Sequence, residues 1–288
     1  PMMPRMAIRH LRAQLNERLG HRADDYYLLG ETYTGAFGQN WIRYYLGEHS
    51  LSGQFDFPTM WTLRSALSGQ LPMSALADQM LLSQSSYADS GAVMAPLMGN
   101  HDVGRIISAL NGDDLYQPRE LMPDVPSSAT PYEQLKMAWT FIMTQPGAPV
   151  IYYGDEIGLP GANDPDNRRP MRFDTELSAL ERDVLAHTKY MGIFRKTSPA
   201  LRRGHLELLH ADDDTLVYAR TSREYGSVIV ALNRSLSERE LTIAWDPQTR
   251  GQISALLGAQ MLQSDTELVL TLEPLSSNST TDQGDYRD

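Results

Sequence analysis

Short apolar segments alternate with helical patterns along the first 200 residues, and this alternation limits the possible folds more than any other feature. The segments that read as strands are 26–33, 53–57, 93–98 and 149–154. Apolar residues recur at helical spacing over 5–19, 60–82 (with a break near Gly69 and Pro72), 132–143 and 176–195. Strands that alternate with helices usually pair in parallel, so the pattern predicts an α/β fold with crossover helices.

The pattern changes after about residue 201. Short β-rich segments follow one another, separated by turn clusters such as Asp212-Asp213-Asp214, at 205–211, 214–221, 226–234, 239–245 and 266–274. These features predict an α/β domain over 1–200 and a small antiparallel β-domain over 201–275. Residues 276–288 are predicted to form a polar tail.

Composition excludes several classes of protein. The 288 residues contain no cysteine, so neither a disulfide framework nor a thiolate metal site is possible. The formal net charge is -11, and the absence of a long basic run argues against nucleic-acid and anionic-membrane partners. No apolar stretch reaches the roughly 18 residues of a membrane span. This composition fits a secreted or periplasmic bacterial enzyme, and equally a cytoplasmic one.

Polar residues stand where three of the four predicted strands end. Glu31 ends the first, His101 and Asp102 end the third, and Asp155 with Glu156 ends the fourth. Parallel strands present their carboxyl ends at one edge, where functional residues collect. An acidic residue after a strand is often only solvated or a helix cap, so the combination carries the argument. Two carboxyl groups at one cleft, one protonated and one ionised, suit glycoside hydrolysis.

Four stretches together resemble the α-amylase family of glycoside hydrolases, and they occur in that family's order. They are "YYLLGETYTG", "LMGNHDVGRI", "GAPVIYYGDEIGL" and "GANDPDNRRPM". The resemblance implies a (β/α)₈ TIM barrel and a retaining mechanism. Only the second half of the barrel, about strands 5–8, would be present here, followed by a small antiparallel β-sandwich.

The resemblance also implies roles for residues of the first two stretches. Glu31 matches the general acid/base, and Asp102 matches the acid that stabilises the transition state through sugar hydroxyls. His101 matches a histidine that hydrogen-bonds the same sugar. Tyr33 stands where relatives often place an aromatic ring against the leaving sugar, although it could equally be a packing residue of the barrel rim.

In "NDPDNR", Asp164 and Arg168 match a pair that holds glucose units on the non-reducing side. The alternative is a turn-rich loop in which the two side chains only bind each other. Asp155 is expected to be structural, and Arg105 is a candidate to brace Asp102. No metal site and no cofactor are assigned. The oxygen-rich "NDPDN" lacks a complete calcium loop, although relatives often hold structural Ca²⁺.

The family nucleophile, an Asp in a motif of the type G-F-R-x-D, has no match before Glu31. The first Asp of the chain is Asp24, in the turn before the first predicted strand. We therefore expect the nucleophile and the N-terminal half of the barrel to be missing, and this chain alone to be inactive. The function expected from the resemblance is retaining hydrolysis of α-glucans of the starch or maltodextrin type. An α-glucan transglycosylase and a non-catalytic sugar-binding or interaction relative remain alternatives.

Overall fold

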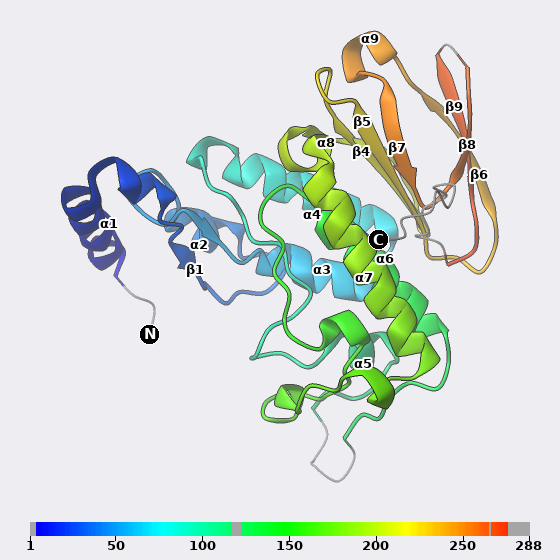
Figure 1. Cartoon of the computed structure of the whole chain (residues 1–288), viewed down its shortest axis with the longest axis horizontal. Helices are drawn as coiled ribbons and strands as arrows, with labels where there is room; N and C mark the ends of the chain where they lie inside the picture. Colours follow the sequence, from blue (N-terminus) through cyan, green and yellow to red (C-terminus); the bar gives the residue numbers. More distant parts are fainter. Residues whose placement is uncertain (1–3, 117–121, 265, 276–288) are drawn as a thin grey trace.

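The computed structural model describes residues 4–116, 122–264 and 266–275 (Figure 1). The predicted tail at 276–288 lies outside these ranges. The helices are α1 (Arg5–Leu19), α2 (Gln39–Tyr44), α3 (Phe57–Leu67), α4 (Met73–Tyr87), α5 (Ile106–Leu110), α6 (Thr130–Thr144), α7 (Ala179–Thr197), α8 (Pro199–Arg203) and α9 (Pro247–Arg250). Within the described residues, none of these is long and apolar enough to cross a membrane. The predicted helices are confirmed, including the break between α3 and α4, but α2, α5, α8 and α9 were not predicted.

Four extended segments of the α/β part pair side by side in chain order. Strand β1 (Leu29–Gly30) pairs in parallel with β2 (Gly53–Gln54), and a parallel bridge joins Phe55 to Ala95. The fourth segment joins the third through two backbone hydrogen bonds, from Ala148 N to Met94 O at 2.8 Å and from Val150 N to Pro96 O at 2.9 Å. The second and third segments approach closely, since a Cβ on Gly53 would lie 2.0 Å from the carbonyl oxygen of Val93.

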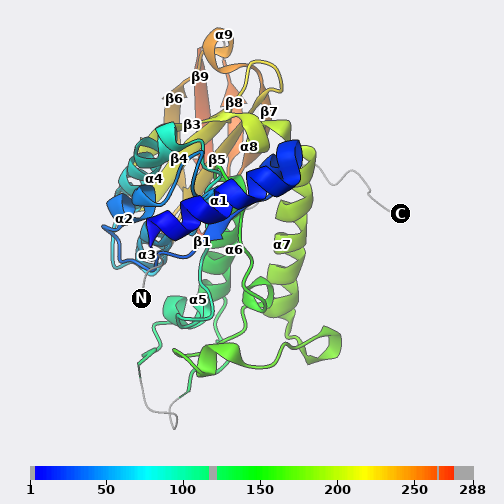
Figure 2. The ribbon, with the colours of Figure 1, turned by 90° about the vertical axis from the view of Figure 1, so that its left-hand side faces the viewer.

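The third and fourth segments are extended but form no regular strands, contrary to the prediction. Pro96 and Pro149 lie within them, and a proline has no N–H to donate to a ladder. Helices α3, α4, α6 and α7 pack beside the segments (Figures 1 and 2). Their contacts form a large core around Leu63, Met80, Trp139 and other apolar side chains.

Local signals explain where two of these helices begin. The Asp56 carboxylate accepts a hydrogen bond from the backbone N–H of Thr59 at 3.3 Å, and Pro58 stands in the first turn of α3. Ser178 and Glu181 form a capping box at the start of α7. Both caps satisfy N–H groups that a helix leaves without an internal partner.

A β-sandwich follows α8 (Figure 2). One sheet has the order β3-β4-β5-β7 and the other β6-β9-β8. The strands are β3 (His205–Ala211), β4 (Thr215–Thr221), β5 (Ser227–Asn233), β6 (Arg239–Ala244), β7 (Ile253–Leu257), β8 (Gln260–Gln263) and β9 (Glu267–Leu272). The prediction located five of these and missed β7 and β8. The predicted antiparallel arrangement is confirmed at four of the five strand pairs in the described part of the sandwich, and the exception is β7, which runs parallel to β5. The chain crosses to the second sheet between them and returns in the same direction.

Strands β4 and β5 are buried on both faces. On one face, Tyr218 and Val230 belong to the core that the helices form. On the other, Val217 and Ile229 meet side chains of the second sheet, such as Leu268. Successive side chains of a strand point to opposite faces, so the two strands connect the sandwich to the α/β part through one continuous core.

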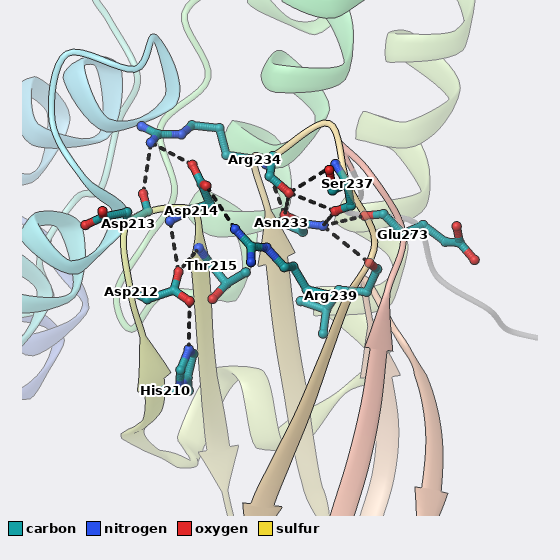
Figure 3. A network of polar contacts seen from close by, with 12 residues as sticks. His210, Asp212, Asp213, Asp214, Thr215, Asn233, Arg234, Ser237, Arg239 and Glu273 are labelled. Carbon is teal, nitrogen blue, oxygen red and sulfur yellow. Dashed lines mark hydrogen bonds and ion pairs between the residues drawn. The ribbon is translucent and has the colours of Figure 1, made fainter.

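A polar joint reinforces this connection (Figure 3). The turn between β3 and β4 offers backbone carbonyls to the start of α4, where Ser74 N donates to Asp212 O at 2.8 Å. Arg234, which follows β5, donates to Leu71 O at 2.7 Å and forms an ion pair with Asp214 at 3.0 Å. Burial would raise the pKa of Asp212, but hydrogen bonds from the hydroxyl and backbone of Thr215 and others outweigh it and lower the pKa to about 2. The Asp212 carboxylate, which organises the turn of this joint, is therefore ionised at neutral pH.

We expect His187 on α7 to make the free energy of unfolding depend on pH. Burial, and then the charge of Lys136, lower the pKa of His187 to about 4, below its ordinary value. The unfolded chain therefore binds more protons than the folded chain between about pH 4 and 6.5, so stability falls as the pH drops through that window. The contribution is at most about 3 kcal/mol.

Urea unfolding of the parent and of His187→Gln between pH 4.5 and 7.5 measures this effect. The variant should lose part of the acid-side destabilisation because Gln does not take up a proton in this pH range. Gln can still reach the Thr140 hydroxyl, which lies 2.9 Å from His187 Nε2, so the local hydrogen bond can be kept. His49→Gln changes an exposed histidine and serves as the control. An unchanged pH dependence in His187→Gln would contradict the assignment.

Candidate active site

Asn100 connects two of the predicted catalytic residues. Glu31 directly follows β1, and its Oε1 accepts a hydrogen bond from Asn100 Nδ2 at 2.8 Å. Asn100 Oδ1 accepts one from the backbone N–H of Asp102 at 2.9 Å. Asn100 is buried, so this one amide orients both the Glu31 carboxyl group and the turn that carries Asp102. The sequence analysis did not assign this residue, although it stands beside His101 in "GNHD".

The structure brings Glu31, His101 and Asp102 together at one open edge. One ligand atom from each lies within 4.8 Å of the others, and all three residues are exposed. His101 Nε2 stands 3.4 Å from Asp102 Oδ1. Two carboxyl groups and an imidazole at this separation can contact one sugar ring from several sides, because each side chain is open to solvent.

Arg168 ties the "NDPDNR" loop to the same edge. Its Nε lies 3.0 Å from Asp164 Oδ1, and its Nη2 lies 3.6 Å from Asp102 Oδ1. Its Nε also donates to His101 O at 3.1 Å. The Asp and Arg therefore bind each other, but not only each other, because the Arg also contacts Asp102 and the backbone of His101. All three side chains are about half exposed, which leaves them accessible to a ligand.

Tyr33, two residues after Glu31, packs against aromatic side chains of α3. Its ring meets Phe57 and Trp61 edge-on, at 5.1 and 6.3 Å between centroids. The residue is still 55% exposed, so one side of the ring is open. Partial burial, followed by the proximity of Tyr116 and Asp102, raises the pKa of Tyr33.

Asn167, another residue that the sequence analysis left unassigned, supports the turn from below. It is fully buried, and its Nδ2 donates to His101 O at 2.9 Å and to Val103 O at 2.8 Å. Arg105 Nε in turn donates to Asn167 O at 2.8 Å. These bonds fix the backbone on both sides of Asp102. The sequence offered only an indirect signal for Asn167, namely its position next to Arg168 in the same motif.

Arg105 supports the turn of Asp102 through Asn167, but its ion pair is with Asp155 and not with Asp102, contrary to the prediction. Arg105 precedes α5, and its side chain points inward, where Nη1 lies 3.0 Å from Asp155 Oδ1. Burial raises the pKa of Asp155 to about 6, although Arg105 and then Arg64 act in the opposite direction. Asp155 is therefore a buried partner of arginine beneath the rim, as its expected structural role requires.

Comparison with known proteins agrees with this geometry. Residues 3–197 match the family described as Alpha amylase, catalytic domain. The chain belongs to the α-amylase family. This confirms the resemblance drawn from the four sequence stretches, and the α/β part is the catalytic-domain fold of that family.

Curated relatives of this α-amylase family chain are larger proteins. It is 30% identical to a cyclomaltodextrinase of Geobacillus thermopakistaniensis over 258 residues, which are 87% of this chain and 39% of the relative. It is also 30% identical to neopullulanase 2 of Thermoactinomyces vulgaris over 182 residues, 62% of this chain and 27% of the relative. The chain thus spans about two fifths or less of these proteins.

Solved structures show that the likeness extends to the fold. The structure of AmyP in complex with maltose superposes with a TM-score of 0.75 at 18% identity, covering 97% of this chain and 63% of that one. An α-amylase from Geobacillus thermoleovorans, complexed with acarbose, gives a TM-score of 0.66 at 21% identity, covering 94% and 57%. At identities of 18% and 21%, these structures support only the fold of this α-amylase family member, not its activity.

Proposed function

We propose that this chain supplies the general acid/base and the transition-state-stabilising carboxylate of a retaining glycoside hydrolase that acts on α-glucans. The observation that carries the proposal is the cluster of Glu31, His101 and Asp102, with ligand atoms within 4.8 Å of one another. In support, the chain belongs to a family of glycoside hydrolases. The maltose- and acarbose-bound neighbours in the family fold favour an α-glucan as the substrate.

In this mechanism Glu31 first protonates the glycosidic oxygen while a nucleophilic carboxylate attacks the anomeric carbon. Glu31, now ionised, then accepts a proton from the water that hydrolyses the covalent glycosyl-enzyme. The Asn100 amide keeps the Glu31 carboxyl group in place through both steps. Asp102, which lies 3.6 Å from Arg168, accepts hydrogen bonds from sugar hydroxyls that strengthen in the transition state.

We further propose that the four parallel segments and their helices form the second half of a (β/α)₈ barrel, over 1–200, with 201–275 as the C-terminal β-domain. The segments pair in chain order, as successive barrel strands do. These 288 residues contain no match to the nucleophile motif. The nucleophile would therefore come from a part of the protein outside them.

The 288-residue chain by itself should release no reducing sugar from starch. A retaining mechanism needs the nucleophile, and correct placement of the sugar accounts for many orders of magnitude of rate. The assay compares the purified chain with its own Glu31→Gln variant. Turnover that disappears in the variant would show that the chain is a self-sufficient enzyme.

In the longer protein that also carries the nucleophile, Arg168→Ala should raise KM for maltooligosaccharides about tenfold with a smaller effect on kcat. An arginine that holds the sugar equally in the ground state and the transition state contributes uniform binding. Arg168→Lys is the matched variant, since it keeps the charge but loses the planar guanidinium group. Its KM should lie between the values of the parent and of Arg168→Ala. An unchanged KM in Arg168→Ala would contradict the role of the "NDPDNR" loop in binding.

A further inference from the structure

Tyr116 is a large, exposed side chain on a loop that is tied to the candidate active site. It follows α5 and is 84% exposed. The backbone of its loop is fixed at two points. Tyr116 N donates to Asp114 Oδ1 at 2.9 Å, and Leu115 O accepts a hydrogen bond from Asn163 N at 3.1 Å. An aromatic ring that is open to solvent on a fixed backbone contributes little to folding, but it can bind a ligand at a small cost in conformational entropy.

The contacts of this loop place it beside the turn that carries Asp102. Asn163 Oδ1 accepts a hydrogen bond at 2.8 Å from Gly104 N, two residues beyond Asp102. Leu115 packs on the same backbone, since a Cβ on Gly104 would lie 2.9 Å from Leu115 Cδ1. Asn163 also begins the "NDPDNR" loop, in which Arg168 lies 3.6 Å from Asp102. The loop after α5 therefore belongs to the same rim as the predicted catalytic residues.

Tyr116 lies close to Tyr33 on this rim. Burial raises the pKa of Tyr33, and the proximity of Tyr116 is the next cause. Tyr116 also acts on Arg64: burial lowers the pKa of this arginine, and the nearby Asp155 and then Tyr116 oppose the change. Arg64 Nη2 donates to Gly104 O at 2.8 Å, on the same turn that the loop of Tyr116 contacts. Two exposed tyrosines, one from the loop after β1 and one from the loop after α5, thus share one part of the rim.

We propose that Tyr116 contacts the substrate and binds, together with Tyr33, one glucose unit of an α-glucan next to Glu31. A pyranose ring carries C–H groups on its faces and hydroxyls around its edge. An aromatic ring can cover such a face while a phenol hydroxyl forms a hydrogen bond with the edge. Tyrosine offers both groups with only two side-chain torsions to fix. This inference rests on the proposed function, because it takes an α-glucan as the ligand.

The test measures the binding of a thio-linked maltotetraose by titration calorimetry, in the longer protein that also carries the nucleophile. The sulfur-linked analogue resists cleavage, so binding is measured apart from the chemistry proposed for Glu31. Tyr116→Ala should raise Kd about tenfold, whereas Tyr116→Phe keeps the ring and should stay within about threefold of the parent. Both variants should unfold at the temperature of the parent, because the residue is exposed.

A double-variant cycle tests whether the two rings bind the same glucose unit. If they do, Tyr33→Ala combined with Tyr116→Ala should weaken binding by at least about threefold less than the product of the two single effects. Tyr26→Ala is the matched control and should leave Kd unchanged. Tyr26 is 53% exposed, close to the 55% of Tyr33, but it precedes β1, whereas Glu31 follows that strand.

Three results would overturn the proposal: a parent that does not bind the analogue, a parent-like Kd in Tyr116→Ala, or single effects that simply multiply in the double variant. Failure of the proposed function would look different. A Glu31→Gln enzyme that cleaved starch like the parent would remove the role of Glu31, whereas the loss of affinity in Tyr116→Ala would stand.

Discussion

In the protein that includes the nucleophile, Glu31→Gln should slow cleavage of unactivated maltooligosaccharides by about a thousandfold or more. General acid catalysis contributes about 10² to 10⁴ in rate, and an alkoxide leaving group needs the proton most. Glutamine can still accept the hydrogen bond from Asn100, which is 2.8 Å in the parent. The loss should therefore appear in kcat with little change in structure.

The leaving group gives this prediction a sharp control. The p-nitrophenolate group of an aryl glycoside such as p-nitrophenyl maltoside can leave without being protonated. The rate at which this substrate forms the glycosyl-enzyme should therefore fall far less in Glu31→Gln. Glu17→Gln, an exposed position on α1, should behave like the parent on both substrates. A Glu31→Gln enzyme within tenfold of the parent on starch would remove Glu31 from the role of general acid.

Asp102→Asn should lower kcat about 10²- to 10³-fold, which is the range for losing one preorganised electrostatic contact in the transition state. The substitution keeps the shape of the side chain but removes the charge that faces Arg168 and His101. Steady-state kinetics on maltooligosaccharides measure it, with Asp164→Asn as the comparison. Asp164 pairs with the same arginine at 3.0 Å but lies outside the three-residue cluster, so its loss should act mainly on KM. Equal losses of kcat in both variants would contradict a special role for Asp102.

Much of the fold could be predicted because the long helices and the outer strands carry clear periodic patterns. Helix α1 and strand β3 begin and end where the sequence indicated. Helix α2, with six residues after Gly38, is too short to show a periodic pattern. The parallel pairing of β7 with β5 could not be read locally, because it depends on where the chain goes between residues 234 and 252.

The residues proposed to carry the chemistry could be identified from the sequence, whereas the residues that hold them in place could not. Glu31 follows β1 and Asp102 follows the third extended segment, and the ends of such segments can be identified from the sequence. Asn100 and Asn167 act across 69 and 66 residues of chain, on Glu31 and on the backbone of His101, and no local pattern reveals such a contact. Proximity in sequence misled in the case of Arg105, because α5 begins just after it and turns its side chain toward Asp155.

The way the β-sandwich is attached affects how this chain can be recombined with others. Strands β4 and β5 complete the helical core, and the turn at Asp212 binds the first turn of α4. Arg234 reaches the end of α3 and Leu71 beyond it. A chimera that exchanged the sandwich at Gly204 alone would break these contacts together and expose apolar helix surface. Because Arg220 of β4 also donates to Thr144 O at the end of α6, exchange between relatives should yield folded hybrids only when α3, α4 and α6 move together with the sandwich.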